Sequence, residues 1–454
     1  MSVPPTNARP DLDPNAVFEA IDFTGLKSVV VAVSGGSDSL ALLYLLATLG
    51  ASRPSFPDII AVTIDHGLRP ESAEEARYVA RLCKEAGIEH QTLNWDGPKP
   101  ATGLSAKARA ARYGLLCKAA REAGTDMVLT GHTLDDQIET FLMRSTRTGE
   151  GSSARGLAGM SAATLLDREI WLVRPLLAIT RDALRGYLRM KAVEWCEDPS
   201  NENPKYERVR IREALRYHDR ELIHAGIIRQ AEQRRSLNVR CAQVLRHCVM
   251  VHDGLLVEIQ RKAWLGQETD AQRLAIGVLL AIAGGHEFLP AGDICDKALQ
   301  HIATDDLPGR TTYSRCILQR KKDNVLIFRE MRSVPQITIQ PQQCAIWDGR
   351  YRIDNQTSRP VGVKACGVDG LHVLRQSEQS ISHRAAALSA PVLVWGDKVV
   401  GLRPALPVGI SVFRHLALFD HILSGYDEDL AQSVADIFQV QGYKPSPVNQ
   451  INKN

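Results

Sequence analysis

Apolar and polar residues alternate along the first 200 positions in blocks whose lengths fit short strands and amphipathic helices. Residues 29–33 form a continuous apolar run, which predicts a strand buried on both faces. In the next block, Leu42, Leu45, Leu46 and Leu49 follow the spacing of one helix face. Further strands are expected at 59–64, 90–93, 127–129 and 170–173. Strands alternating with helices predict an α/β domain with a parallel sheet.

Capping residues indicate where the intervening helices begin and end. A helix over about 71–86 is expected to stop at Gly87, since glycine often follows the last helical turn. Ser105 is expected to cap a helix that ends at Gly124, and Thr180 a helix that runs to about residue 190. A further helix is expected over residues 134–144.

The pattern changes after about residue 205. Residues 201–262 carry 13 Lys and Arg against 8 Asp and Glu on a mostly helical pattern. Between about 335 and 425, β signals dominate, and Asp348-Gly349 and Gly396-Asp397 predict two-residue hairpin turns. The expected fold class is therefore a parallel α/β domain, then a helical domain and a smaller β-rich domain. We place the regions at 1–24 (a flexible segment), 25–216 (α/β), 217–332 (mainly helical), 333–425 (β-rich) and 426–454 (a polar, loosely held tail).

Composition narrows the function classes. The net charge is only +3 over 454 residues, so any nucleic-acid surface must be a local patch. The nine cysteines are scattered without a Cys-x-x-Cys pair, which argues against a zinc ribbon or a disulfide framework and favours a reducing cytoplasm. No secretory signal or membrane span is evident. Three tryptophans, at 195, 347 and 395, are expected in the core rather than as base-stacking platforms.

A Gly/Ser loop follows the first predicted strand and precedes the first helix. Its residues are Ser34, Gly35, Gly36, Ser37, Asp38 and Ser39. Free backbone N–H groups and the positive end of a helix dipole at such a point bind phosphate. The loop lacks the lysine of a Walker loop and the spacing of a dinucleotide fingerprint, so it predicts a pyrophosphate cradle. The alternative is an ordinary strand-to-helix turn with Asp38 favoured by the dipole.

A second polar cluster, residues 131–140, follows the fourth predicted strand. In an open parallel sheet, the loops at the carboxyl ends of neighbouring strands face one crevice, so this cluster is expected to face the phosphate loop. Asp135, Asp136 and Glu139 share a helix face. Acids beside a triphosphate predict a bound cation, and carboxylate and phosphate oxygens favour Mg²⁺. A capping box between Thr133 and Asp136 is the plainer alternative, and it accounts for Asp136 alone.

These segments resemble those of a known family. Ser34–Ser39 matches the SGG-x-DS signature of the N-type ATP pyrophosphatases of the PP-loop superfamily. The chain is similar to the tRNA(Ile)-lysidine synthetases over about residues 25–216. The motifs occur in the order of that family, namely Asp65–Arg69, Ala108–Tyr113, Gly131–Thr140, Arg174–Leu177 and Glu197–Asn201.

The resemblance implies an activity. Such enzymes adenylate the C2 oxygen of the wobble cytidine of an isoleucine tRNA with a CAU anticodon, using ATP, and free L-lysine then displaces AMP to form lysidine. ATP, Mg²⁺, lysine and the tRNA are the implied ligands and partners. The sequence leaves open whether the protein forms a homodimer.

The resemblance also implies site residues. Catalytic roles fall to Asp38, His132, Asp135, Asp136 and Glu139, with metal binding assigned among Asp38, Asp135 and Asp136. ATP binding falls to residues 34–39 with Asp65, His66, Arg109, Arg112 and Gly131. Arg208, Arg210 and Arg212 form the expected tRNA-binding strip, in which Val209 replaces a common asparagine. The alternative for Arg109 and Arg112 is a solvated helix face, and the alternative for the strip is a set of surface arginines paired with Glu207 and Glu213.

Other readings stay open. A tRNA 2-thiolation enzyme of the same superfamily is the nearest alternative, although such enzymes usually rely on activated or cluster-binding cysteines. A small-molecule synthetase of the amidotransferase type fits the basic helical region less well. A tRNA-binding protein with an inactive nucleotide domain is the alternative from another class. The Gly-rich loop at 149–159 is a candidate lid.

Overall fold

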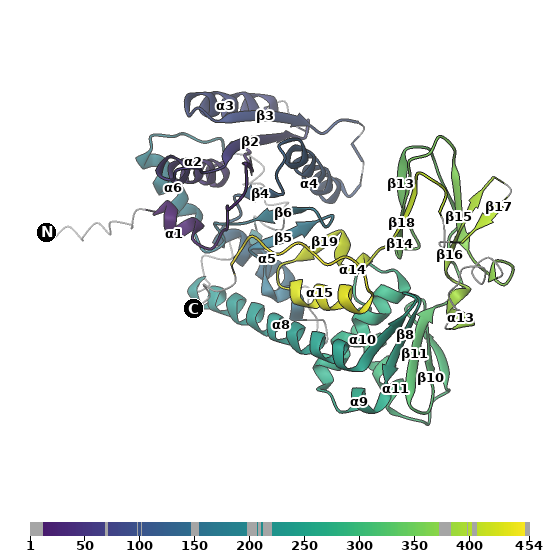
Figure 1. Cartoon of the computed structure of the whole chain (residues 1–454). Coiled ribbons are helices and arrows are strands. Elements are labelled where there is room, and N and C mark those ends of the chain that lie inside the picture. The colour runs from purple at the N-terminus through teal and green to yellow at the C-terminus, as the bar shows by residue number, and fades with distance from the viewer. Residues whose placement is uncertain are drawn as a thin grey trace. The chain divides into compact units, whose positions relative to one another are not determined.

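The computed structural model describes most of the chain, and Figure 1 shows its elements along the sequence. The described residues are 12–68, 71–97, 99–100, 102–146, 154–197, 207, 210–211, 220–371, 383–396, 398–401 and 406–449. The chain forms two compact units. Unit 1 comprises residues 1–232 and 444–454, and unit 2 comprises residues 233–443.

Unit 1 is built on parallel strands with helices between them, as the hydrophobic pattern predicts. The strands that it contributes to its sheet lie in the order β5-β6-β4-β1-β2-β3, in which β5 is Ala163–Leu166. Strands β1 to β4 and β6 are Ser28–Ala32, Asp58–Asp65, Glu89–Asn94, Met127–Thr130 and Ile170–Val173. The pairings β1–β2, β1–β4, β2–β3 and β4–β6 are all parallel. The expected α/β class is confirmed, and the first and fourth strands are neighbours.

Helices flank this sheet and bury its apolar residues. They are α1 (Pro14–Phe18), α2 (Ser37–Ser52), α3 (Ser72–Glu85), α4 (Leu104–Glu122), α5 (Leu134–Ser145), α6 (Arg181–Met190) and the start of α8 (Arg220–Cys248). Helices α2 and α6 pack together, and α4 packs on β1, β2 and β4 (Figure 1). All five residues of β1 are buried, so the continuous apolar run does mark a strand covered on both faces.

Two details of this unit differ from the sequence-based expectations. Helix α4 begins one residue before Ser105, and Gly103, with a φ of +65°, is its N-cap. Strand β5 (Ala163–Leu166) was not expected, and it pairs antiparallel with β6. The cap at Thr180 is confirmed, because its side chain accepts a hydrogen bond from the Ala183 N–H.

Both ends of unit 1 contain packed residues where a flexible segment and a loose tail were expected. Phe18 in α1 is completely buried. Ile21 forms an antiparallel bridge with Val448. The backbone N–H of Asp22 donates to the Pro447 carbonyl at 2.8 Å. Apolar side chains near residue 20 therefore hold the described end of the chain in place.

Unit 2 combines helices with antiparallel sheets. Its helices after α8 are α9 (Arg261–Leu265), α10 (Thr269–Gly284), α11 (Gly292–Ala303), α13 (Arg384–Ala387), α14 (Ala417–Asp420) and α15 (Glu428–Ile437). One sheet has the order β7-β8-β11-β10-β9, from Val249–His252, Leu256–Gln260, Asn324–Arg329, Cys316–Arg320 and Arg310–Tyr313. The expectation of a mainly helical region at 217–332 missed these five strands.

The β-rich region is confirmed as two further antiparallel sheets. Their orders are β12-β15-β16-β17 and β13-β14-β18, from Ile337–Ile339, Val361–Ala365, Pro391–Trp395 and Lys398–Val400, and from Gln343–Trp347, Tyr351–Asn355 and Ile410–Arg414. A short strand, β19, covers Ile422–Ser424.

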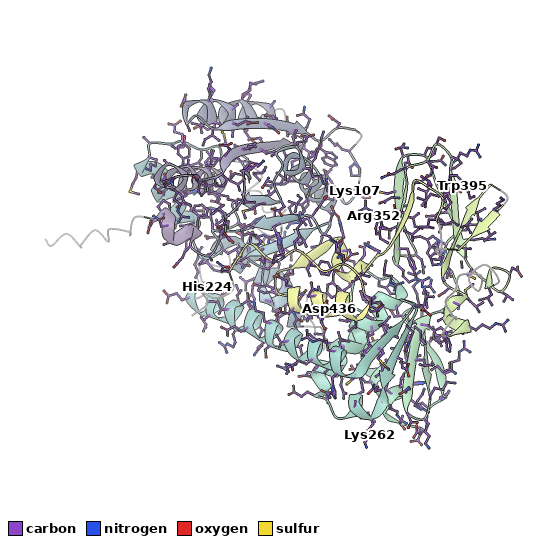
Figure 2. All side chains as sticks on the ribbon, viewed as in Figure 1. Lys107, His224, Lys262, Arg352, Trp395 and Asp436 are labelled. Carbon is purple, nitrogen blue, oxygen red and sulfur yellow. The ribbon has the colours of Figure 1, made fainter. Side chains whose placement is uncertain are left out.

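The hairpins and tryptophans of this region are partly as expected. Trp347 pairs with Tyr351, so the hairpin at Asp348-Gly349 has a three-residue loop rather than two. Trp395 pairs with Lys398, as a two-residue turn requires. Trp347 is fully buried, whereas Trp395, labelled in Figure 2, is only partly buried. Trp195 in unit 1 is also only partly buried, so two of the three expected core tryptophans lie nearer the surface.

Candidate active site

The Gly/Ser loop joins β1 to α2, as the sequence predicts. Its backbone is held from within: the Ser34 N–H donates to Ser39 Oγ at 3.1 Å, and Ser39 Oγ donates to the Gly36 carbonyl at 3.1 Å. Gly35 has a φ of +87°, a conformation that glycine adopts without strain. Asp38 lies in the first turn of α2 and accepts a hydrogen bond from Ser37 Oγ at 3.0 Å. The loop therefore presents a helix N-terminus in the form that binds phosphate groups.

Cys196 lies against this loop, which the sequence analysis missed. Its backbone N–H donates to the Gly35 carbonyl at 2.9 Å. Its sulfur lies 3.5 Å from the position that a Cβ on Gly35 would take. Burial raises the pKa of the Cys196 thiol, so the reactive thiolate is disfavoured. The segment before Glu197 thus supports the loop backbone.

The second cluster lies next to the loop because β4 and β1 are neighbours. A Cβ added to Gly131 would stand 2.9 Å from the carbonyl oxygen of Asp38, so the two chain segments touch through their backbones. Thr133 caps α5, and the capping box with Asp136 is present in full. Asp136 Oδ2 accepts hydrogen bonds from the N–H and the Oγ1 of Thr133, at 2.9 and 3.0 Å. Asp136 therefore serves the cap as well as facing the loop.

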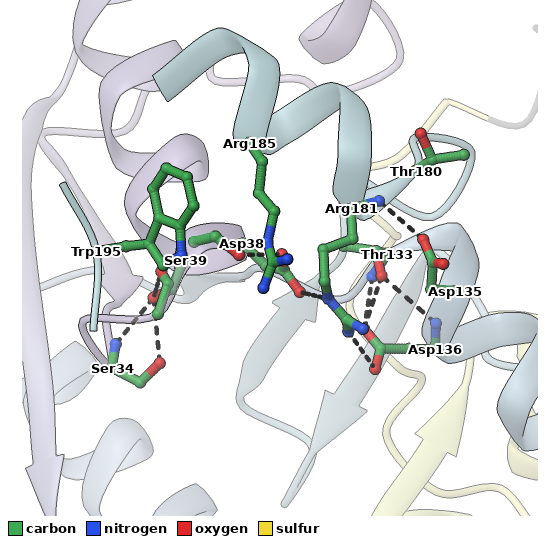
Figure 3. Close-up of polar contacts among 12 residues, drawn as sticks. Ser34, Asp38, Ser39, Thr133, Asp135, Asp136, Thr180, Arg181, Arg185 and Trp195 are labelled. Atoms are coloured by element: carbon green, nitrogen blue, oxygen red, sulfur yellow. Dashed lines mark hydrogen bonds and ion pairs between the residues drawn. The ribbon is translucent and has the colours of Figure 1, made fainter. Parts of the chain in front are cut away.

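Arg181 links the acids of the two segments (Figure 3). Its Nε lies 2.9 Å from Oδ2 of Asp38, and its Nη2 lies 3.5 Å from Oδ1 of Asp136. The Arg181 backbone N–H donates to Oδ2 of Asp135 at 2.8 Å. Arg220, the first residue of α8, pairs with the other oxygen of Asp135 at 2.8 Å. Neither arginine was expected at the site, since both lie more than 40 residues beyond the acids.

Burial and charge set the protonation states in this cluster. Burial raises the pKa of Asp38, and the neighbouring Arg181 guanidinium offsets only part of this shift. Burial alone would lower the pKa of Arg181, but Asp38 and Asp136 raise it well above its ordinary value. Glu139 is completely buried on α5 and adds to the negative field at Arg181. Arg181 is therefore a permanent cation among acids.

The expected metal ligands are not grouped as a metal cage. Among the residues that the structure describes, no three His, Cys, Asp or Glu side chains are placed to hold a metal ion. Asp38, Asp135 and Asp136 instead contact the guanidinium and backbone groups of Arg181 and Arg220. Mg²⁺ in nucleotide sites commonly uses one or two carboxylates together with substrate phosphates. Asp38, in the phosphate loop, fits that arrangement as a single carboxylate ligand, without Asp135 and Asp136.

A cavity of about 150 Å³ opens beside the carboxyl ends of the strands. It is lined by residues that the sequence analysis assigned to ATP or catalysis, together with their neighbours: His66, Ala108, Arg109, Arg112, Tyr113, Thr130 and His132. The lining contains two guanidinium groups and no carboxylate, so it suits an anionic or polar ligand.

The two histidines in this cavity are kept neutral. Burial lowers the pKa of His132 to about 3, and the charge of Arg174 adds to the shift. Its Nδ1 lies 3.0 Å from Thr130 Oγ1. Burial likewise lowers the pKa of His66, which Arg112 reinforces. A neutral imidazole donates or accepts one hydrogen bond at each nitrogen, so both rings suit recognition of polar ligand atoms.

Asp65 lies at the end of β2, and its side chain forms hydrogen bonds within the segment that follows this strand. Its Oδ1 accepts hydrogen bonds from Ser72 Oγ at 2.7 Å and from the Gly67 N–H at 2.8 Å. The Ser72 hydrogen bond lowers the pKa of Asp65, against the opposing effect of burial. Asp65 therefore orders the loop that carries His66.

The remaining predicted residues are described in part. Of the expected tRNA-binding strip, Arg210 is described and exposed, whereas Arg208 and Arg212 lie outside the described residues. The candidate lid at 149–159 is described from Ala154, where a short 3₁₀ helix covers Ala154–Ala158. Arg144 Nη1 donates to the Gly156 carbonyl at 2.7 Å, so this part of the loop is tied to α5.

Comparison with known proteins shows what the chain is similar to. Residues 14–218 match the model of the PP-loop domain family. The chain is 39% identical over 436 residues to a protein of Brucella canis named tRNA(Ile)-lysidine synthase, covering 93% of this chain and 97% of that one. A protein of the same name from Brucella melitensis is 39% identical over 435 residues, with the same coverage. The match thus extends across both units.

Solved structures resemble the chain more distantly. The U34-tRNA thiolase NcsA from Methanococcus maripaludis, solved with its [4Fe-4S] cluster, shares 19% identity with a TM-score of 0.39. It covers 48% of this chain and 77% of its own. A TM-score this low supports no argument about fold or activity. Within the described residues, no helix is both long and apolar enough to cross a membrane.

Proposed function

The chain belongs to the tRNA(Ile)-lysidine synthase family, and on that premise we propose that it joins free L-lysine to C2 of the wobble cytidine of an isoleucine tRNA. It is an ATP-using ligase of the PP-loop superfamily. The observation that carries the proposal is the junction of two segments far apart in sequence. Asp38 of the phosphate loop and Asp136 of α5 both contact the guanidinium of Arg181.

The first step activates the base. A cytosine C2 oxygen is a poor leaving group, so the base must first become a phosphate ester. The C2 oxygen attacks the α-phosphorus of ATP, the bond from that phosphorus to the β-bridging oxygen breaks, and pyrophosphate leaves. The N–H groups and hydroxyls of residues 34–39 hold the departing pyrophosphate, because preorganised donors stabilise charge that develops during the reaction. Mg²⁺ bound with the phosphates would neutralise part of that charge, with Asp38 as its protein ligand.

The second step transfers lysine. The ε-ammonium group must lose a proton before its nitrogen can attack C2, after which the C2–O bond breaks and AMP departs. The bond that forms is C2–N, and the nitrogen releases a second proton. A carboxylate of the cluster accepts the first proton.

The cavity beside the cluster is proposed to hold part of the nucleotide or the cytidine. Arg109 and Arg112 supply cationic donors for phosphate oxygens, and neutral His66 and His132 supply hydrogen bonds to uncharged polar atoms. The basic strip that includes Arg210 is proposed to contact the RNA backbone. Action in the cytoplasm on a tRNA with a CAU anticodon completes the proposal.

Labelled lysine tests the function directly. Purified protein, ATP, Mg²⁺ and an isoleucine tRNA transcript are incubated with radiolabelled lysine, and label in the RNA and AMP release are measured. Asp38→Ala should abolish both, whereas Asp58→Ala, a change at an exposed acid in β2 of the same unit, should leave both unchanged. Wild-type protein that places no lysine in the RNA would overturn the proposal. Full activity in Asp38→Ala would show that Asp38 is not part of the catalytic machinery.

The thiolation alternative has one structural point in its favour and one against. Cys196 lies beside the phosphate loop, where a sulfur carrier would be useful. Burial raises the pKa of its thiol, which opposes that chemistry. The relatives that match across 93% of the chain are named for lysidine synthesis and do not favour the alternative.

A further inference from the structure

Arg181 occupies the position of a cation that the proposed reaction has to admit. Its guanidinium lies between a carboxylate of the phosphate loop and a carboxylate of α5, and no main-chain segment separates it from either. Within the part of the chain that the structure describes, Arg220 also pairs with this cluster, through Asp135. Asp38 and Asp136 are thus neutralised by one residue of this chain.

The architecture holds Arg181 in place by its backbone rather than by its side chain. Thr180 caps α6, and the Arg181 N–H donates to Asp135 at 2.8 Å. The Arg181 side chain is 20% exposed, and those of Asp38 and Asp136 are 18% and 15% exposed. Since α6 stays anchored through its cap, the guanidinium can leave the carboxylates toward solvent without unwinding the helix.

The incoming substrate requires the same partners. A lysine ammonium has three donors and no acceptor, so it binds where carboxylate oxygens converge. The proposed chemistry also places a carboxylate next to the ε-nitrogen, because that group must take its proton. A guanidinium and an ammonium cannot both occupy the gap between Asp38 and Asp136, where the Arg181 nitrogens already lie 2.9 and 3.5 Å from the acids.

We propose that Arg181 is a positioning residue that holds Asp38 and Asp136 together as a resident cation, and that the ε-ammonium of substrate lysine displaces it. The inference rests on the proposed function. Part of the binding free energy of lysine is then used to displace the guanidinium. Arg181 therefore weakens lysine binding while keeping the two acids aligned. The same competition discriminates against amino acids whose side chains carry no cation, because these cannot replace the guanidinium.

Two substitutions at Arg181 and one control separate this role from others. Arg181→Gln removes the charge, and Arg181→Lys keeps the charge but loses the planar fork that contacts two acids at once. Arg185→Gln is the matched control. Arg185 lies one turn along α6 (Figure 3), is 30% exposed and pairs with Glu197 at 2.9 Å. Lysine and ATP dependence of lysidine formation are measured for each variant, and lysine binding is measured separately by calorimetry with norleucine as the uncharged probe.

We expect Arg181→Gln to lower both the KM and the Kd for lysine by about 10-fold, with the KM for ATP changed by less than about 3-fold. The kcat should fall, since Asp38 is no longer aligned. Arg181→Lys should lie between this variant and the wild type, norleucine should bind none of the proteins, and Arg185→Gln should match the wild type. If Arg181→Gln does not fold, the lysine KM of Arg181→Lys decides the question.

Other outcomes would overturn the inference. A raised KM for ATP with an unchanged KM for lysine would identify Arg181 as a phosphate-binding residue. Tighter binding of Mg²⁺ but not of lysine to Arg181→Gln would identify the gap as a metal site. An unchanged lysine KM in Arg181→Lys and Arg181→Gln would leave Arg181 with a structural role only. Calorimetry needs no turnover, so failure of lysidine formation in the wild type would reject the proposed function without deciding the role of Arg181.

Discussion

The backbone of Gly131 touches the backbone of Asp38. A Cβ on Gly131 would stand 2.9 Å from the Asp38 carbonyl oxygen and 3.0 Å from the Ser39 Cα. Contacts this short with main-chain atoms cannot be relieved by a side-chain rotation. The closeness of the two loops, and with it the alignment of Asp38, therefore depends on the absence of a side chain at position 131.

Gly131→Ala should displace the first turn of α2 and lower kcat/KM for lysidine formation by about 100-fold, the usual effect of a shift of about 1 Å at a reacting group. Gly114→Ala is the control, because a Cβ there meets nothing within 4 Å in α4. The control should keep full activity and gain about 0.5–1 kcal/mol of stability from the better helix former. Full activity in Gly131→Ala would show that the loops are not rigidly coupled.

His132 should make the folded protein sensitive to acid. Its pKa is lowered by burial to about 3, whereas an unfolded histidine titrates near 6.5. Below about pH 6.5 the imidazole is therefore protonated in the unfolded chain but not in the folded chain. The free energy of unfolding consequently decreases as the pH falls from about 6.5 to about 3. His132→Asn lacks this group, so its midpoint of thermal unfolding should fall less between pH 7.5 and 5.5 than that of the wild type. Parallel slopes for the two proteins would contradict the expectation.

Asp348 should be essential to the stability of unit 2. This fully buried carboxylate pairs with Arg329 at 3.1 Å, with Arg350 at 2.7 Å and also with Arg315. Arg329 and Arg350 are 1% exposed, so Asp348→Ala removes the buried acid with which both guanidinium groups pair. We expect a loss of about 3–5 kcal/mol in chemical unfolding followed by tryptophan fluorescence.

Asp354→Asn is the control for that measurement. Asp354 pairs with Arg352, which is 54% exposed on β14 and is labelled in Figure 2. Exposed pairs contribute little, so the change should stay within about 0.5 kcal/mol. Equal effects of the two substitutions would show that the buried cluster is not a source of stability.

The last described residues should stabilise unit 1. The Asn449 N–H donates to the Ala20 carbonyl at 2.8 Å, next to the bridge between Ile21 and Val448. A chain that ends at Tyr443 loses these backbone bonds, and we expect the unfolding midpoint of unit 1 to fall by several degrees. Lys444→Ala, which removes an exposed pair with Asp126 and an exposed hydrogen bond to the Glu169 carbonyl, should cost less than about 1 kcal/mol. A truncated chain as stable as the full one would refute the prediction.

The sequence predicts those parts of the fold that depend on local chemistry. The run at 29–33 is apolar on both faces, which fits a buried strand. The caps at Thr133 and Thr180 form because each threonine oxygen accepts a hydrogen bond from the N–H three residues later. The strands of the 249–329 sheet were missed because their burial depends on partners far along the chain. Leu326, for example, faces Glu258 across β8 and β11.

The candidate site shows the same division. The phosphate loop and the acids of α5 can be read from local motifs, and their proximity follows from the order of a parallel sheet. Arg181 and Arg220 have no local signal, since an arginine at the start of a helix has no favourable dipole interaction there. Their positions make sense only beside the acids that they neutralise. For the same reason, the sequence could not predict that Asp38, Asp135 and Asp136 pair with arginines instead of forming a metal cage.

Unit 1 comprises residues 1–232 and 444–454, so the 211 residues of unit 2 are inserted into its sequence. A ribosome makes the phosphate loop before unit 2 but completes the domain that contains the loop only after unit 2. At ordinary rates of synthesis the gap is roughly 10–40 s, during which unit 2 emerges and can fold first. The catalytic half of the protein therefore matures only after the half between its two segments has been completed.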